Sequence, residues 1–511
     1  MITLEINPEA IRRRIWEIIP GLLSWSSLVI LTILALTASF WIAIFVIAYD
    51  VYILIRIVYM SVHLLYAYRR LKEYRTVNWI QKLNEEKSEI NWNSVHHIIV
   101  IPTYDESIHV LRTSIASLAA ADYPKERMHV VIGFEERAGE AAKNRAKKLS
   151  KEFTSLFGTF LTAFHPDGIP GEKRVKSANA TWAIQRIEEV LESKKIPEDM
   201  VLVSNFDSDT VAPPEYFSYL TYVFSMTPDR YRASYQPIPV YNNNLWDAPS
   251  FSRVVAMGST FWQMIESTRP ERLVTFSSHS MTLKVLKDVG YWHRNVISED
   301  SRIFWQCLLK YNGNYRAIPL YTTVSMDAAL APTWWQTLKN QYKQKRRWAW
   351  GIENFPYLVE GFIQNKKIPL QTKATYLFRT LEGHYSWATA PIIVAVLGWL
   401  PVLFGDSSFH QTFLSYSLPF ITRTLMTIAM SGLVISATLT ILLLPKRPGH
   451  YSPFRYALII VQWALVPIIA TVLSAFPALD SETRLMLGRD LNFNVMQKSR
   501  KHVTAHGVEV V

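Results

Sequence analysis

The stretch from Met200 to Asp209, Met-Val-Leu-Val-Ser-Asn-Phe-Asp-Ser-Asp, decides the fold that we expect for this chain. Its first half is a short apolar run with β-branched residues, which is typical of a buried strand. Two carboxylates at a spacing of two, Asp207 and Asp209, follow directly. In open α/β sheets, ligands bind at the carboxyl ends of the strands. The stretch therefore predicts a strand that ends in an acidic site.

Strands and helices alternate on the amino-terminal side of this stretch. The residues predict strands at His96–Ile101 and Met128–Phe134, and helices at Ser107–Ala121 and Asn179–Ser193. Such alternation favours a mostly parallel sheet with helices on both faces. Asp105 follows the first of these strands, in Pro-Thr-Tyr-Asp-Glu. The expected fold class is α/β, with acidic side chains gathered at one edge of the sheet.

Apolar segments flank this mixed region on both sides. Residues 18–68 form an apolar stretch of about 50 residues, and one span needs roughly 20, so we expect two spans here. A turn between them is expected near Thr37–Trp41. Further apolar segments lie at His384–Phe404, Leu418–Leu444 and Tyr456–Phe476. Basic residues flank the first pair of spans, which predicts that the mixed region lies in the cytoplasm.

The basic carboxy-terminal tail limits the number of spans. If all three carboxy-terminal segments crossed the membrane, the tail would lie outside, against the positive-inside rule. We expect a cytoplasmic tail, so either Tyr456–Phe476 is re-entrant around Pro467 or the number of spans differs by one. The predicted organisation is residues 1–75 with two spans, 76–331 as a cytoplasmic α/β domain, 332–370 as interface helices, 371–480 as further spans, and 481–511 as a cytoplasmic tail.

The composition agrees with a membrane protein. Hydrophobic residues make up 49% of the chain and charged residues 19%, less charge than a uniformly soluble protein carries. The net charge of +12 is explained by basic residues beside the spans, or by attraction for anionic donors and lipids. No nucleic-acid-binding motif is present, so we do not expect a nucleic-acid partner. The single cysteine, Cys307, excludes an intramolecular disulfide framework.

Two acidic groups at strand ends could bind a ligand. Asp105 could accept hydrogen bonds from a base or ribose, or it could simply help to cap the following helix. Asp207 and Asp209 could hold one Mg²⁺ or Mn²⁺ that keeps open positions for diphosphate oxygens. Such a triplet also occurs in surface turns, but its place after an apolar strand favours the metal site.

Two groups nearer the carboxyl terminus could serve an acceptor. In Glu299-Asp300, a carboxylate could deprotonate an acceptor hydroxyl, or the pair could cap the next helix. In the segment Gln344-Lys-Arg-Arg-Trp348, Arg347 could bind diphosphate oxygens and Trp348 could pack on a sugar ring. An amphipathic helix at the membrane surface would show the same basic and Trp residues.

These four groups of residues occur in an order that resembles the inverting family 2 glycosyltransferases with membrane spans. The most similar patterns are those of the cellulose-synthase-like, chitin-synthase and hyaluronan-synthase enzymes. The resemblance covers nearly the whole chain. It implies a GT-A, Rossmann-like glycosyltransferase domain in the cytoplasm, inserted between transmembrane helices of the inner or plasma membrane. It also implies a nucleotide-sugar donor, a UDP-sugar, together with Mg²⁺ or Mn²⁺ and a glycan or lipid acceptor. Accessory export subunits are compatible with this resemblance, but the residues do not identify any.

The resemblance also implies roles for single residues. Asp300 would be the general base. The donor would be bound by Asp105, Glu135, Lys176 with Asn179, Asp207, Asp209 and Arg347, the metal by Asp207 and Asp209, the acceptor by Trp348, Gln344 and Glu299, and a gating loop over the donor would contain Phe493, Val495 and Lys498. Two departures stand out: Glu135-Glu136 replaces the usual Asp-Asp pair, and Met496 stands where the gating loop has Thr.

Three functions are compatible with these residues. A processive polysaccharide synthase is favoured by the candidate spans and the gating-like tail. A non-processive glycolipid synthase, of the ceramide or diacylglycerol type, shares the same four-part pattern. A transporter or receptor with a soluble domain would carry many polar groups deep in its spans. Only Asp50, Arg56 and Arg423 fit that last description.

Overall fold

The computed structural model describes residues 8–491, and its centre is a seven-stranded sheet with strand order β3-β2-β1-β4-β6-β5-β7. Neighbouring strands are parallel, except that β6 is antiparallel to both β4 and β5. The expected mixed α/β fold is confirmed. The strands are β1 (His96–Pro102), β2 (Met128–Glu135), β3 (Thr159–His165), β4 (Val201–Asn205), β5 (Ala233–Val240), β6 (Ser280–Thr282) and β7 (Arg316–Ser325).

Helices cover both faces of the sheet because successive side chains of a strand point to opposite faces. On β1, Ile99 and Ile101 pack with residues of α4 (Ile108–Ala119), α5 (Gly139–Phe153) and α7 (Tyr216–Met226). Ile98 and Val100 pack on the other face with residues of α6 (Lys176–Leu191), α9 (Leu283–Asp288) and α10 (Glu299–Lys310), among others. Both faces of β1 are therefore core, which is why its sequence is apolar without alternation.

Within residues 8–491, five helical segments are long and apolar enough to cross a membrane: Ile11–Thr37, Ser39–Arg75, Leu370–Phe404, Phe413–Leu442 and Arg455–Met486. They contain α1 (Pro8–Thr37), α2 (Ser39–Arg75), α13 (Leu370–Ala395), α14 (Leu400–Phe404), α16 (Phe413–Ala429), α17 (Ser431–Leu442), α18 (Arg455–Val461), α19 (Val466–Ala470) and α20 (Phe476–Met486). The break between α1 and α2 falls inside the predicted turn.

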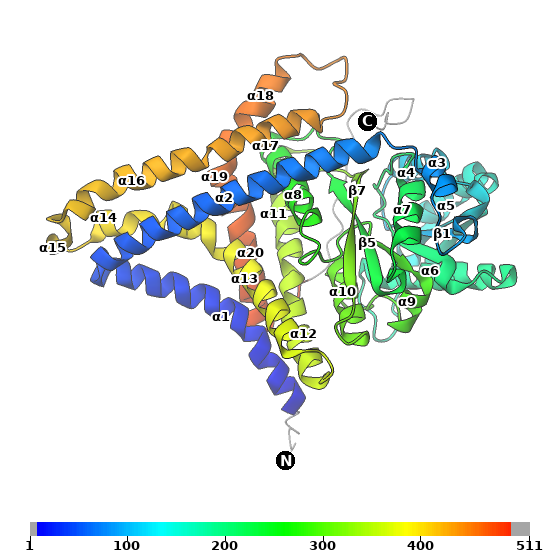
Figure 1. The fold of residues 1–511 in the computed structure, drawn as a ribbon, viewed down its shortest axis with the longest axis horizontal. Helices are drawn as coiled ribbons and strands as arrows, with labels where there is room; N and C mark the ends of the chain where they lie inside the picture. The colour runs from blue at the N-terminus through cyan, green and yellow to red at the C-terminus, as the bar shows by residue number, and fades with distance from the viewer. Residues whose placement is uncertain (1–7, 492–511) are drawn as a thin grey trace.

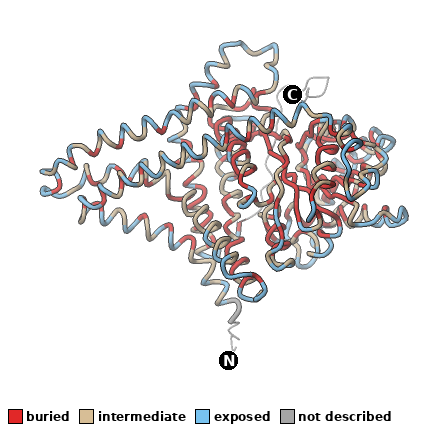
Figure 2. The backbone as a smooth tube through the Cα atoms, viewed as in Figure 1, coloured by how far each residue is buried: buried red, intermediate tan, exposed pale blue. Residues whose placement is uncertain are grey.

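The surface of these helices is apolar. Trp41, Ile55 and Phe413 are 69%, 63% and 83% exposed, whereas the residues of the sheet are mostly buried (Figure 2). Large apolar side chains in such numbers on one part of a surface mark a contact with lipid or protein. Together with the length of the helices, this surface indicates a membrane protein.

The last of the five segments differs from the others, because both of its ends contact the part of the molecule that carries the sheet. At its start, Arg455 Nη2 donates to the carbonyl oxygen of Trp246 at 2.9 Å. Just past its end, Lys173 Nζ lies 2.8 Å from Asp490 Oδ2. In Figure 1, α20 runs beside α11 (Trp334–Ala349), whereas α1, α16 and the start of α2 extend away from the sheet.

Irregular turns and prolines inside this segment bend it. A 3₁₀ turn at Gln462–Leu465 and a π-helical turn at Thr471–Ala475 interrupt it, and Pro467 and Pro477 lie beside these irregular turns. Both features bend helices. Both ends of this segment thus lie at the sheet domain, as a re-entrant path of Tyr456–Phe476 would require. The choice between a re-entrant path and a different number of spans stays a prediction, because the segment is also long enough to cross a membrane. A re-entrant path predicts that the tail lies on the same side of the membrane as the sheet domain.

Cysteine labelling tests this path. We expect Ser407→Cys, between α14 and α16, to react with a membrane-impermeant maleimide in intact right-side-out vesicles. Ser452→Cys and Ala505→Cys should react only after permeabilisation, because a re-entrant last segment would return to the side of the membrane on which it starts. The native Cys307 is buried and gives little background. Labelling of Ala505→Cys in intact vesicles would mean that the last segment crosses the membrane.

Candidate active site

A cavity lies at the carboxyl ends of β1, β2 and β4, and most of the predicted site residues line it. The parallel strands bring these residues together, as expected for the carboxyl edge of an open sheet. Its lining includes Glu135, Lys176, Asn179, Asp207, Asp209, Glu299, Asp300, Gln344, Arg347 and Trp348.

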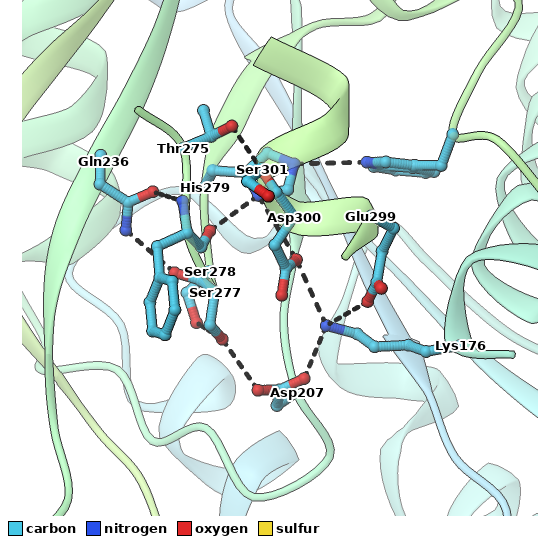
Figure 3. A network of polar contacts seen from close by, with 12 residues as sticks. Lys176, Asp207, Gln236, Thr275, Ser277, Ser278, His279, Glu299, Asp300 and Ser301 are labelled. Atoms are coloured by element: carbon cyan, nitrogen blue, oxygen red, sulfur yellow. Dashed lines mark hydrogen bonds and ion pairs between the residues drawn. The ribbon is translucent and has the colours of Figure 1, made fainter. Parts of the chain in front are cut away.

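Lys176 lies at the centre of the acidic residues, and its side chain is only 11% exposed. Its Nζ is 2.6 Å from Asp207 Oδ1, and it is 3.7 Å from Glu299 Oε1 and 3.6 Å from Asp300 Oδ1. Figure 3 shows the carboxylates of these residues turned toward the ammonium. Burial lowers the pKa of Lys176, but the surrounding carboxylates outweigh it and raise the pKa above its usual value. Lys176 is therefore a cation that holds the acidic cluster together.

The two carboxylates of the Glu-Asp pair have different surroundings. Glu299 is buried, and burial, followed by the charge of Asp300, raises the pKa of Glu299 to about 8. The Asp300 side chain is 23% exposed and faces the cavity. A carboxyl group that is buried beside a second carboxylate favours its protonated form. Asp300 is the member of the pair that a ligand in the cavity can reach.

His279 lies beside Asp300 and is neutral. Its Nδ1 is 2.9 Å from the carbonyl oxygen of Phe276, and its Nε2 accepts a hydrogen bond from Trp292 Nε1 at 3.3 Å. A ring nitrogen that accepts carries no proton, so the proton is on Nδ1. Burial lowers the pKa of His279 and so favours this neutral form. The cation facing Asp300 at this position is Lys176, not His279 (Figure 3).

Asp207 and Asp209 are held by hydrogen bonds at the end of β4. Ser277 Oγ donates to Asp207 Oδ2 at 2.8 Å, and the backbone N–H of Asp327 donates to Asp209 Oδ2 at 2.8 Å. Carboxylate oxygens are the ligands that Mg²⁺ and Mn²⁺ prefer. Within residues 8–491, no group of three or more His, Cys, Asp or Glu side chains is arranged to hold a metal. A metal here would use one or two carboxylates together with water and ligand oxygens, which fits Mg²⁺.

The remaining wall comes from α11. Gln344, Arg347 and Trp348 stand at positions i, i+3 and i+4, which share one face of a helix, and all of them line the cavity. The Trp348 ring lies 5.6 Å from the ring of Tyr241 and 6.3 Å from that of Phe276, measured between centroids. These contacts fix the indole at the mouth of the cavity.

The loop after β1 departs from the expected arrangement. Asp105 does not line the cavity: its side chain is 74% exposed and lies 3.6 Å from Arg145. The neighbouring Tyr104 and Glu106 line the cavity instead, and Glu106 Oε2 accepts from the backbone N–H of Tyr104 at 2.9 Å. The contact of Asp105 with a donor stays a prediction. The predicted gating residues Phe493, Val495 and Lys498 lie outside the described residues.

Several lining residues had no signal in the sequence. Tyr241, Ser277 and Asp327 follow or precede elements that we did not predict, β5, β6 and β7. Each of them contacts a predicted site residue: Tyr241 packs against Trp348, Ser277 donates to Asp207, and the backbone N–H of Asp327 donates to Asp209. Only the run of polar residues Ser277-Ser278-His279 before β6 could have pointed to this part of the site.

Residues 202–477 match the family described as Glycosyl transferase family group 2, and this match covers more than half of the chain. The chain belongs to this family. The prediction of a family 2 glycosyltransferase is therefore confirmed, whereas the cellulose-synthase-like, chitin-synthase-like or hyaluronan-synthase-like subfamily stays a prediction. Among curated proteins, none matches the sequence of this glycosyltransferase.

Solved structures of glycosyltransferases are distantly similar. A mannosyltransferase from Pyrobaculum calidifontis with GDP-mannose and Mn²⁺ is 13% identical, covers 83% of this chain and 99% of its own, and has a TM-score of 0.38. TarS of S. aureus, residues 1–349 with UDP-GlcNAc, is 11% identical with 81% and 100% coverage and a TM-score of 0.36. GalNAc-T7 with UDP, GalNAc and Mn²⁺ is 9% identical with 59% and 61% coverage and a TM-score of 0.34. We draw no conclusion about substrate from this degree of similarity.

Replacing Asp209 tests the acidic turn. Asp209→Asn should abolish sugar transfer, because the amide keeps an acceptor for the Asp327 N–H but loses the charge that a metal needs. Nucleotide release from a nucleotide sugar is the measurement. EDTA should stop the wild-type reaction, and Mg²⁺ or Mn²⁺ should restore it. Asp229→Asn, at an exposed position away from the cavity, is the matched control and should behave as the wild type. Full activity in excess EDTA would exclude the metal.

Proposed function

We propose that this protein is a processive inverting glycosyltransferase, which transfers a sugar from a UDP-sugar to a growing β-linked polysaccharide at the cell membrane. Its sheet domain would lie in the cytoplasm, where nucleotide sugars are available. The observation that carries this proposal is the meeting of the Asp-Ser-Asp turn, the Glu-Asp pair and the Gln-x-x-Arg-Trp face of α11 in one cavity. Each of these groups alone could have a purely structural role, in a helix cap, a surface turn or an interfacial helix. Their convergence on one cavity favours a shared reaction.

The donor side of the cavity must accept a diphosphate despite its carboxylates. Lys176 offsets part of their negative charge, and Arg347 offers a planar guanidinium that suits phosphate oxygens. A divalent metal at Asp207 and Asp209 would supply further positive charge for the departing diphosphate. Glu135 and Asn179 line the same cavity and complete the proposed donor site.

The chemical step is a single displacement. The acceptor hydroxyl attacks the anomeric carbon from the face opposite the nucleotide, and its oxygen forms the new glycosidic bond. Asp300 takes the hydroxyl proton, while the bond between the anomeric carbon and the phosphate oxygen breaks. The bonding electrons leave with the diphosphate, which Arg347 stabilises. An α-linked donor thus gives a β-linked product.

The Glu-Asp pair allows a direct comparison of two carboxylates. Asp300→Asn should lower turnover by about 10²–10⁴-fold, the usual effect of removing a general base. The affinity for the donor should change less, since this interaction is needed in the transition state. Glu299→Gln should cost less turnover, because Glu299 already favours its protonated form. Turnover is measured at saturating donor. Near-normal turnover of Asp300→Asn together with a severe loss in Glu299→Gln would assign the base to Glu299.

Contacts between α11 and the apolar helices support an acceptor path toward the membrane. Arg346 Nη1 lies 2.8 Å from Asp480 Oδ2 of α20, and Ser481 Oγ donates to the carbonyl oxygen of Arg346 at 2.6 Å. Farther out, Arg56 of α2 and Glu382 of α13 form an ion pair at 3.3 Å. Ionisable groups inside spans are costly and mark substrate paths in many membrane proteins. Polymer leaving the site would follow this polar route.

A glycolipid synthase is the second candidate, and the same ion pair favours it. The side chains of Arg56 and Glu382 are each 26% exposed. Polar groups that remain accessible between apolar helices suit a lipid headgroup that arrives from the side of the bilayer. The two candidates share donor, base and inversion, and they differ only in the number of sugars added.

Product size separates the candidates. A processive enzyme must bind the newly added sugar as its next acceptor, and the flat Trp348 ring provides such a platform. Trp348→Ala should therefore shorten the polymer strongly at saturating donor, while hydrolysis of the donor by water should fall less. The measurement combines product length on a gel with release of free nucleotide. A wild-type product that carries a single sugar on a lipid would refute processivity and favour the glycolipid synthase.

A further inference from the structure

Lys345 of α11 lies beside the cavity. Its surroundings differ from those of Lys176 on α6. Lys345 is half-buried, and its Nζ is 3.1 Å from Ser259 Oγ of α8 (Ser250–Ser267). The ammonium lies over two indole rings, 5.0 Å from the centroid of Trp348 and 5.5 Å from that of Trp387 on α13. Its contacts are thus one hydroxyl and two aromatic faces.

This cation has no counter-ion in the part of the chain that the structure describes. None of the carboxylates there lies within 4.0 Å of Lys345 Nζ, whereas Lys176 has several within that distance. Burial lowers the pKa of Lys345 to about 8, and no neighbouring charge opposes this effect. A partly buried charge without a partner is unfavourable. The two rings and the hydroxyl compensate for only part of the lost hydration.

The surroundings of Lys345 connect the cavity to the apolar helices. Trp387 Nε1 donates to Ser474 Oγ, in the π-helical turn of the last segment, at 2.8 Å. His384, one turn before Trp387, lies against Gly351, where an added Cβ would be 3.7 Å from His384 Cε1. Gly351 and Trp348 both line the cavity. The ammonium is therefore next to the acceptor platform, where the cavity meets α13.

We propose that Lys345 binds the phosphate group of a lipid acceptor and so places the acceptor hydroxyl beside Trp348. This inference rests on the proposed function and names its acceptor class. A lysine ammonium is a compact charge with three donors, and it suits phosphate oxygens. Basic pockets between membrane helices at the cytoplasmic side bind anionic headgroups. Such a lipid is the primer if the enzyme makes a polymer, and the acceptor itself if it makes a glycolipid.

The geometry favours a lipid phosphate over an acidic sugar. One wall of the Lys345 site is α13, which is itself part of an apolar segment long enough to cross a membrane. Lipid phosphates lie at the membrane surface, where such a segment leaves the bilayer. A soluble acidic oligosaccharide would not need a site built on this helix.

Binding of two matched lipids tests the proposal. The probes are phosphatidylglycerol and diacylglycerol with the same acyl chains, in neutral detergent with delipidated full-length protein. The variants are Lys345→Met, which keeps the length of the side chain without its charge, and Lys345→Arg, which keeps the charge. Lys343→Met is the control, since Lys343 is exposed on the same helix. Dissociation constants for both lipids and for UDP are measured for each protein.

We expect the wild type and Lys343→Met to prefer phosphatidylglycerol over diacylglycerol by about tenfold or more, as a charge-assisted hydrogen bond allows. Lys345→Met should lose this preference, and Lys345→Arg should keep part of it. The proposal is overturned if the wild type shows no preference or if Lys345→Met retains it. It is also overturned if Lys345→Met weakens UDP binding as much as lipid binding, which would assign Lys345 to the donor.

Two further measurements separate the remaining explanations. Inorganic phosphate should not displace phosphatidylglycerol at millimolar concentration; displacement would mean a site for free phosphate and would overturn the lipid assignment. Preferential binding of a glucuronic-acid oligosaccharide, with loss in Lys345→Met, would replace the lipid by an acidic sugar and also overturn it. Failure of the wild type to release nucleotide from any nucleotide sugar would refute the proposed function alone, because lipid binding is measured without a donor.

Discussion

The ammonium of Lys176 among the carboxylates of the cavity is the interaction on which the site depends. Lys176 is the first residue of α6, Glu299 is the first of α10, and Asp207 follows β4. The Lys176 ammonium thus links the start of α6 to the start of α10 and to the end of β4 through its ion pairs. Without it, the carboxylates of Asp207 and Asp300 would repel each other in a largely buried place, where unpaired charges are strongly unfavourable. The fold can hold so acidic a site because α6 begins there.

The two lysines, Lys176 in the cavity and Lys345 beside it, have surroundings of different charge. Around Lys176, carboxylates outnumber the ammonium, so this region suits a metal and a leaving diphosphate. Around Lys345, the cation faces only a hydroxyl and aromatic rings, so this region suits an anion. Trp348 lies between these environments. A donor and an anionic acceptor would meet at Asp300 without competing for the same cation.

The sequence predicted the parts of the site that local patterns encode. The strands β1, β2 and β4 are apolar and rich in β-branched residues, and parallel strands bring the residues at their carboxyl ends together. The short, antiparallel β6 has no such pattern, so Ser277 was missed. The choice between Asp105 and Glu106 also depends on tertiary structure. Glu106 accepts from Thr103 and Tyr104, which leaves Asp105 facing Arg145 and solvent.

The last apolar segment shows why hydropathy alone could not define the membrane part. Hydropathy reports the length of a segment but not where its ends lie, and this segment is long enough to cross. Its polar contacts hold its end against the sheet domain, because Asp480 and Ser481 bind Arg346 on α11. Arg346 directly precedes Arg347 and Trp348, so this last segment holds the helix face that lines the cavity. This apolar segment thus supports the site, because it lies against the wall where donor and acceptor would meet.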